Sequence, residues 1–192
     1  MPSQPPSPPV GWLPTRSRVP GLVLACLLAG LAAAQSSREY DLKAVFLYNF
    51  ATFVEWPEDA RPAPGQPLLI GILGRDPFGK VLDEVVRGEK LNDHPLEVRR
   101  YGTLERAQEA HILYISPSEA DRLPQILRFL RGKPVLTVAD VPRPAATDAM
   151  ICFATGARVQ LQVNPTAAEQ AGLSISSKLL RVATVVGAEA PP

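Results

Sequence analysis

The stretch PLLIGILGRDPFGKVLDEVVRG, Pro67–Gly88, has the pattern of a strand, a turn and a helix in succession. Leu68–Leu73 is short and continuously apolar, which is typical of a strand buried on both faces of a parallel sheet. Asp76 and Pro77 are expected to cap and begin the helix, and Gly88 is expected to end it. This unit predicts a protein of the α/β class.

The rest of the chain repeats this alternation, with short loops between the segments. Ser116 and the residues after it form a capping box, and Pro124 in the segment that follows predicts either a kink or a single turn before a fresh helix. The expected architecture is a three-layer α/β sandwich with a mostly parallel central sheet, an antiparallel hairpin at its edge and helices on both faces. The remaining segments are strands at Leu96–Tyr101, Ile112–Ile115 and Pro134–Val138, a hairpin of Met150–Ala154 with Ala157–Val163 around Thr155 and Gly156, and a last helix marked by Leu179, Val182, Ala183 and Val186.

The N-terminal segment predicts a cleavable signal peptide over residues 1–34. Arg16 and Arg18 precede fourteen residues without a charge, GLVLACLLAGLAAA, and a bilayer span needs about 20 apolar residues. The small residues that close this run place the cleavage between Ala34 and Gln35. A lipoprotein signal ending at Cys26 is the alternative. The expected mature domain is 35–192, and it is expected to be exported.

Charge and cysteine content narrow the function classes. The formal net charge of +1 becomes −1 once the two arginines leave with the signal. Both values of the net charge are close to zero, and Lys and Arg are not clustered in the sequence. Nucleic acid is therefore not favoured as a partner. Cys152 then stands alone, so no intramolecular disulfide is expected. We interpret Cys152 as a small core residue rather than a reactive or intermolecular thiol.

An aromatic stretch, LKAVFLYNFATFVEWP, opens the mature domain at Leu42–Pro57. Its apolar residues recur at helical spacing on one broad side, which predicts an amphipathic helix ended by Pro57. Most of its aromatic side chains are expected in the core. Tyr48 and Trp56 project toward the polar side, so we expect these two to reach the surface and contact a partner.

The sequence contains no recognisable catalytic or metal-binding motif. Its two histidines, His94 and His111, lie in different segments without acidic or cysteine neighbours at ligand spacing, so no metal site is expected. No motif identifies a cofactor or a catalytic residue. The best local candidate for a ligand site is the turn after the first strand, with Gly74, Arg75, Asp76, Phe78 and Gly79, because ligands of open α/β sheets gather beyond the carboxyl ends of strands. The alternative is that the glycines only form the turn and Asp76 only caps the helix.

Five separated motifs together resemble the YfiR family of periplasmic regulators. The opening helix is similar to the family's L-Y-N-F core followed by W-P, and the closing segment is similar to its A-G-L-x-I-S-S signature. The motifs are KAVFLYNFATFVEWP (Lys43–Pro57), IGILGRDPFG (Ile70–Gly79), HILYIS (His111–Ser116), VLTVAD (Val135–Asp140) and VNPTAAEQAGLSISSKLLRVA (Val163–Ala183).

This resemblance implies a regulator without enzymatic activity of its own, which binds the periplasmic sensor domain of an inner-membrane diguanylate cyclase and lowers cyclic-di-GMP, and with it biofilm growth. It also implies a homodimer and release by an OmpA-like outer-membrane lipoprotein. Met150 and Phe153, beside an irregular loop, are further expected partner contacts. The alternative function is a periplasmic small-molecule-binding sensor that acts on another membrane sensor, such as a sensor kinase, or on a transport system.

Overall fold

The computed structural model describes residues 38–141, 148–155 and 159–187, all within one compact unit that spans residues 37–192. Its centre is an eight-stranded sheet in the order β10-β8-β7-β6-β5-β2-β4-β3. The middle strands β4, β2, β5, β6 and β7 pair in parallel, whereas β8 runs antiparallel to β7 and β3 antiparallel to β4. The strands are β2 (Leu68–Leu73), β3 (Lys90–Leu91), β4 (His94–Tyr101), β5 (Ile112–Ile115), β6 (Leu136–Asp140), β7 (Ile151–Thr155), β8 (Val159–Val163) and β10 (Thr184–Val185).

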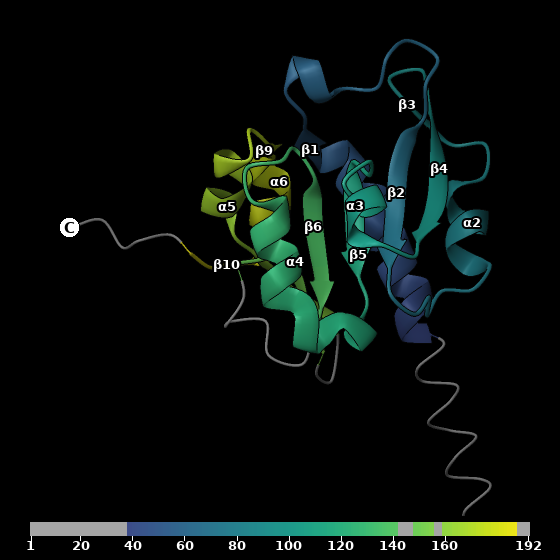
Figure 1. Cartoon of the computed structure of the whole chain (residues 1–192). Helices are drawn as coiled ribbons and strands as arrows, with labels where there is room; N and C mark the ends of the chain where they lie inside the picture. The colour runs from purple at the N-terminus through teal and green to yellow at the C-terminus, as the bar shows by residue number, and fades with distance from the viewer. Residues whose placement is uncertain (1–37, 142–147, 156–158, 188–192) are drawn as a thin grey trace, which may run out of the picture. The chain divides into compact units, whose positions relative to one another are not determined.

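Helices cover both faces of this sheet, which confirms the predicted three-layer α/β sandwich (Figure 1). The N-terminal helix, residues 38–53, packs on one face together with three shorter helices, and α3 and α4 pack on the other. Two 3-10 helices lie in connections of the chain: η1 (Glu58–Ala60) between β1 and β2, and η2 (Pro117–Arg122) between β5 and α4. The helices are α2 (Val81–Val86), α3 (Leu104–Ala107), α4 (Leu123–Leu130), α5 (Pro165–Gln170) and α6 (Ser177–Leu180).

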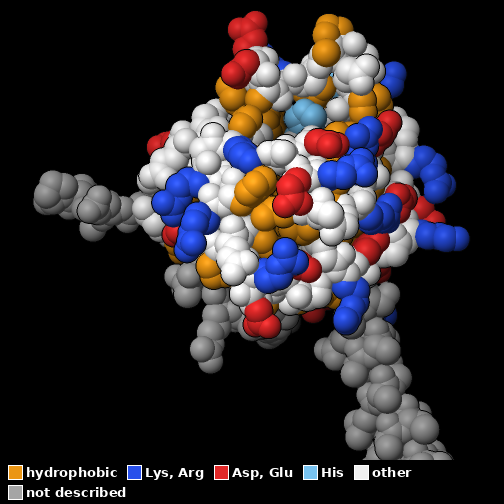
Figure 2. All heavy atoms as spheres, in the orientation of Figure 1, with side chains coloured by type: hydrophobic (Ala, Val, Ile, Leu, Met, Phe, Trp, Pro, Cys, Tyr) orange, Lys and Arg blue, Asp and Glu red, His pale blue; other side chains and the backbone are white. Residues whose placement is uncertain are grey.

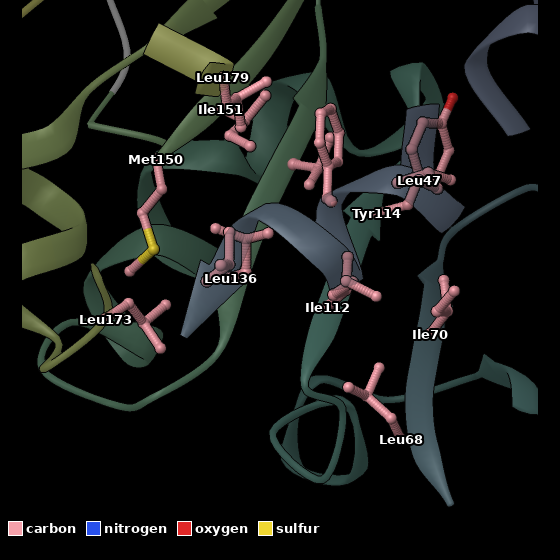
Figure 3. Close-up of a cluster of buried hydrophobic side chains, with 14 of the residues drawn as sticks. Leu47, Leu68, Ile70, Ile112, Tyr114, Leu136, Met150, Ile151, Leu173 and Leu179 are labelled. Carbon is pink, nitrogen blue, oxygen red and sulfur yellow. The ribbon is translucent and has the colours of Figure 1, made fainter. Parts of the chain in front are cut away.

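Strand alternation divides the buried side chains into two cores. In β5, Ile112 and Tyr114 face the N-terminal helix while Leu113 and Ile115 face α4, as the two-residue period of a strand requires. Figure 3 shows the first core, in which Leu47 of the N-terminal helix lies near Tyr114. Continuous apolar runs are therefore the sequence signal of a sheet covered on both sides.

The predicted boundaries of three helices are wrong, and the strand predicted at Pro134–Val138 is β6 at Leu136–Asp140. The N-terminal helix ends at residue 53 rather than at Pro57, because Val54 and Glu55 form strand β1 and pair antiparallel with β9 (Ser174–Ile175). Helix α2 starts at Val81 rather than at Pro77. The predicted last helix stops at Leu180, and β10 follows it at the edge of the sheet.

Other predictions agree with the structure. A fresh helix, α4, begins at Leu123 with Pro124 in its first turn, as predicted, although the 3-10 helix η2 before it has six residues and is longer than the predicted single turn. Strands β7 and β8 pair antiparallel as the predicted hairpin, although residues 156–158 between them lie outside the described residues. The predicted signal peptide, residues 1–34, also lies outside them. No helix in the described ranges has the length and apolarity needed to cross a membrane.

The surface in Figure 2 carries charges of both signs. Lys and Arg side chains are interspersed with Asp and Glu, and hydrophobic side chains lie between them near the middle of the face. Mixed charges cancel over short distances, so this face produces no field of one sign to steer a polyanion.

Gly71 should tolerate no side chain. A Cβ at this position in β2 would lie 2.7 Å from Cε2 of Tyr101 and 2.8 Å from Cβ of Ala110. We expect Gly71→Ala to lower the free energy of unfolding by about 1–3 kcal/mol in urea denaturation, since the neighbouring core must move. Gly102 is the matched control, because a Cβ there meets no atom within 4 Å. If Gly71→Ala were as stable as Gly102→Ala, the close packing of β2 on β4 would be contradicted.

Candidate ligand and partner sites

The carboxyl ends of β2, β5 and β6 meet at one edge of the sheet, because these neighbouring strands are parallel. The turn that contains Arg75 follows β2, Ser116 follows β5, and Asp140 is the last residue of β6. This edge is where open α/β sheets bind their ligands. The N-terminal helix passes the same edge and places Tyr40 and Lys43 there.

Most of the predicted ligand residues in the turn hold the turn itself. Phe78 is buried and packs edge-on against Tyr114, with ring centroids 4.7 Å apart. Asp76 accepts a hydrogen bond from the backbone N–H of Phe78 at 2.7 Å, so it stabilises the turn instead of capping α2. Gly74 and Gly79 adopt φ of +92° and +56°, which is unfavourable for other residues. Arg75 is exposed and lines a hollow at this edge of the sheet.

Arg100 clamps this turn to β4. Its Nε donates to Asp76 at 3.0 Å, its Nη1 donates to Asp83 at 2.8 Å, and its Nη2 donates to the carbonyl oxygen of Gly79 at 2.8 Å. The side-chain hydrogen bond from Arg100 lowers the pKa of Asp83 despite partial burial. Both carboxylates are thus occupied by one guanidinium, so Asp76 has a structural role.

A buried ion pair lies behind the turn. Lys43 of the N-terminal helix is 1% exposed, and its Nζ donates to both carboxylate oxygens of Asp140, at 2.9 and 2.8 Å. The hydroxyl of Tyr114 donates to the same carboxylate at 2.7 Å. Glu39, one helical turn before Lys43, forms a second ion pair with it. This network joins the N-terminal helix to the middle of the sheet.

The network shifts the pKa values of its members. Burial alone would lower the pKa of Lys43, but hydrogen bonds to Asp140 and Glu39 outweigh it, and the pKa is raised. Burial, followed by the negative charge of Asp140, raises the pKa of Tyr114. The same causes in the same order raise the pKa of Tyr40. Lys43 therefore stays charged and both tyrosines stay protonated through neutral pH.

Sequence reasoning missed this network, although one signal was present. Lys43 lies four and seven residues before Leu47 and Phe50, which places it on the buried side of the helix. A lysine on an apolar face needs a partner of opposite charge. Asp140, at the end of the apolar run of β6, is that partner.

The expected partner contacts are mostly interior residues. Trp56 and Phe153 are buried in the first core, so the expectation that Trp56 reaches the surface is wrong. Met150 is also buried, although it lines a hollow of about 380 Å³ between α4 and α5. Tyr48 is half-buried at the surface, where its hydroxyl donates to Glu89 at 3.0 Å. Residues 142–147 of the loop before Met150 lie outside the described residues.

The solvent side of the N-terminal helix is partly apolar. Leu42 and Val45 are 45% and 41% exposed and lie three residues apart, and Tyr48 follows after three more. This spacing brings them together on one side of the helix. We call Leu42, Val45 and Tyr48 the outer helix face. Exposed apolar side chains grouped in this way are typical of surfaces that bind another protein.

His111 should make stability depend on pH. Its Nδ1 accepts a hydrogen bond from the backbone N–H of Leu69 at 3.0 Å, which requires the neutral ring, and burial followed by the charge of His94 lowers its pKa. A lowered pKa in the folded state means that this stabilisation is present above the ordinary pKa of about 6.5 and is lost as pH falls through the folded-state value. We expect the free energy of unfolding to drop between pH 7 and pH 5.

The matched variant is His111→Asn, whose side-chain oxygen can accept the same hydrogen bond without titrating. Its stability relative to that of the unmodified protein should improve steadily as pH falls over this interval, measured by urea denaturation at each pH. A constant difference would contradict the assignment of this pH dependence to His111.

The comparisons with known proteins identify the family. A search of curated proteins finds no match. Residues 40–184 match the family model described as DUF4154, YfiR/HmsC-like, from Tyr40 on the N-terminal helix to the start of β10. The match covers most of the chain and includes the turn, the buried ion pair and the outer helix face. The chain therefore belongs to the YfiR/HmsC-like family, whose members are periplasmic and regulatory rather than catalytic.

Proposed function

We propose that this protein is a periplasmic inhibitor of a membrane-bound diguanylate cyclase. It binds the periplasmic sensor domain of that enzyme, holds it inactive and so lowers cyclic-di-GMP. The family match over residues 40–184 is the observation that carries this proposal. The proposal includes export by a cleavable signal peptide, with cleavage between Ala34 and Gln35, and a homodimeric regulator that an OmpA-like outer-membrane lipoprotein sequesters to allow biofilm growth.

The outer helix face is the surface that we assign to the cyclase. Its two aliphatic residues, Leu42 and Val45, are among the most exposed large hydrophobic side chains of the described residues. Tyr48 beside them supplies an aromatic ring with a polar end, the kind of side chain enriched in binding hot spots. The three residues leave from a helix that is fixed to the sheet, so the face is presented in one orientation.

A negatively charged side chain on the outer helix face should weaken binding to the sensor domain. We expect Val45→Glu, and Leu42→Glu likewise, to weaken binding to the sensor domain by about tenfold or more, because a carboxylate must lose its water in an apolar contact. Val182→Glu is the matched control, since Val182 is 73% exposed on a different element and should leave the affinity unchanged. Calorimetric titration of each variant with the periplasmic sensor domain of the diguanylate cyclase gives the affinities.

The cellular test uses the same variants. Deletion of the gene should raise cyclic-di-GMP, and complementation with Val182→Glu but not with Val45→Glu should restore the low level. If deletion leaves cyclic-di-GMP unchanged, the cyclase is not the target. If both variants complement equally, the cyclase binds at another surface.

A further inference from the structure

The hollow at the carboxyl edge of the sheet has the composition of a small ligand site. Its volume is about 410 Å³, within the range of pockets that hold small molecules. It lies between the turn after β2, the turn after β5 and the start of the N-terminal helix. Its lining residues are Tyr40, Arg75, Pro77, Ser116, Pro117 and Ser118.

Arg75 brings an unused positive charge to this hollow. Its guanidinium makes no hydrogen bond or ion pair with any described residue. The neighbouring acids are already engaged: Asp76 with Arg100 at 3.0 Å, and Glu119 with Arg122 at 3.2 Å. A free guanidinium among engaged carboxylates is available for an anion from outside.

The backbone around Arg75 is fixed before any ligand arrives. The N–H of Arg75 donates to Oγ of Ser118 at 2.8 Å, which ties the turn after β2 to the turn after β5. Gly74 permits this approach, because a Cβ there would lie 2.6 Å from the same Oγ. A site held in place in this way loses little conformational entropy on binding.

Ser116 adds a buried donor. It is 2% exposed, and its Oγ accepts hydrogen bonds from the N–H and the hydroxyl of Ser118 at 3.4 and 3.3 Å. A hydroxyl carries one proton besides its acceptor lone pairs. Ser116 accepts in both of these hydrogen bonds, so its own hydroxyl proton is not used in them. The side chain lines the hollow.

We propose that this hollow binds a small monocarboxylate with an apolar or aromatic body. The guanidinium of Arg75 matches a carboxylate in fork geometry, and the hydroxyl of Ser116 supplies a further donor. The ring of Tyr40 and the rings of Pro77 and Pro117 form the apolar walls. A single cation with acidic neighbours is poorly suited to a dianion, so a phosphate monoester is the less favoured ligand.

The ligand would connect two elements that lie far apart in the sequence. Tyr40 belongs to the first turn of the N-terminal helix, and Arg75 to the turn after β2. A carboxylate on Arg75 whose body contacts Tyr40 stabilises the helix against the sheet edge, just before the outer helix face begins at Leu42.

The test uses the protein expressed with its own N-terminal segment and purified from the cell envelope. Phenylacetate, its neutral analogue phenylacetamide and phenyl phosphate are titrated separately, with binding followed by calorimetry and by the shift in melting temperature. We expect phenylacetate to bind and to raise the melting temperature, with phenylacetamide and phenyl phosphate weaker by about tenfold or more. No saturable phenylacetate binding, or equal binding of the amide, would overturn the proposal, and tighter phenyl phosphate binding would overturn the ligand class.

Variants locate the site. Arg75→Ala should weaken phenylacetate binding by about tenfold or more, and Arg75→Lys should recover part of the affinity because it keeps the charge but loses the fork. Arg99→Ala, which removes an exposed arginine on β4 that pairs with Glu97, is the matched control. Equal losses in Arg75→Ala and Arg99→Ala would reject this hollow as the site. None of these measurements requires the cyclase, so they succeed or fail independently of the proposed function.

Discussion

Lys43→Met should lower the free energy of unfolding by about 3–5 kcal/mol, because it removes one partner of a buried ion pair. The variant removes a cation that is 1% exposed and leaves the carboxylate of Asp140 buried, with Tyr114 as the remaining hydrogen-bond donor that the structure gives it. An uncompensated charge away from water is far more costly than the ion pair is stabilising. Urea denaturation at pH 7 measures the loss directly.

The double variant Lys43→Met, Asp140→Leu separates charge from packing. Replacing both partners with apolar side chains should restore much of the lost stability, since no isolated charge remains. Arg99→Met is the control, because its pair with Glu97 is exposed and such pairs contribute about 0–1 kcal/mol. A loss for Lys43→Met as small as the loss for Arg99→Met would contradict the stabilising role assigned to the buried ion pair.

Phe153→Ala should cost about 3–5 kcal/mol, because it opens a cavity in the first core. The ring is fully buried and lies 6.1 Å, centroid to centroid, from both Phe46 and Phe50 of the N-terminal helix. The nitrogen of Lys43 lies 5.5 Å from the same ring centroid. Thermal and urea denaturation should both report the loss.

Phe153→Leu distinguishes a core role from a partner contact. It keeps most of the apolar volume, so we expect a loss nearer 1 kcal/mol and unchanged affinity for the sensor domain at temperatures where the variant is folded. A drop in affinity without a matching drop in stability would support the sequence-based expectation that Phe153 contacts a partner. The burial of the ring favours the core role.

The central layer of the fold was predictable because its signal is local. Apolar runs such as Leu68–Leu73 and Ile112–Ile115 cannot be anything but interior at their length, and Gly88 ends α2 with the positive φ of 77° expected of it. The hairpin of β3 and β4 was missed, although Asn92 and Asp93 have the composition of a tight turn and adopt φ of 47° and 68°.

The wrong boundaries share a physical cause, which is tertiary pairing that overrides local preference. Val182 and Val186 have helical spacing, but the segment between them pairs with β8 instead and becomes β10. Glu55 and Trp56 continue the pattern of the N-terminal helix in the sequence. Val54 and Glu55 nevertheless form strand β1, because Val54 pairs with Ile175 of β9. The local sequence of each segment does not indicate the strand with which it pairs.

The candidate sites were predictable only in part for a similar reason. Arg75 was identified because a turn after a parallel strand has a known position in the fold, but nothing in the turn shows that Ser116 and Ser118 lie beside it. The pairing of Lys43 with Asp140 joins residues that are 97 positions apart in the chain. A single sequence records that both are charged, but it does not record that they meet.

The short pairing of β1 with β9 affects the order in which the molecule can mature. The backbone N–H of Ser176 donates to the carbonyl oxygen of Phe53 at 2.8 Å, and Val54 lies opposite Ile175, so the first helix receives its final neighbours from nearly the last residues of the domain. A chain that leaves a ribosome or a membrane pore with its amino end first cannot form the pairing of β1 with β9 until the residues of β9 have emerged. The native state is therefore completed late, and contacts between residues this far apart in the sequence slow folding.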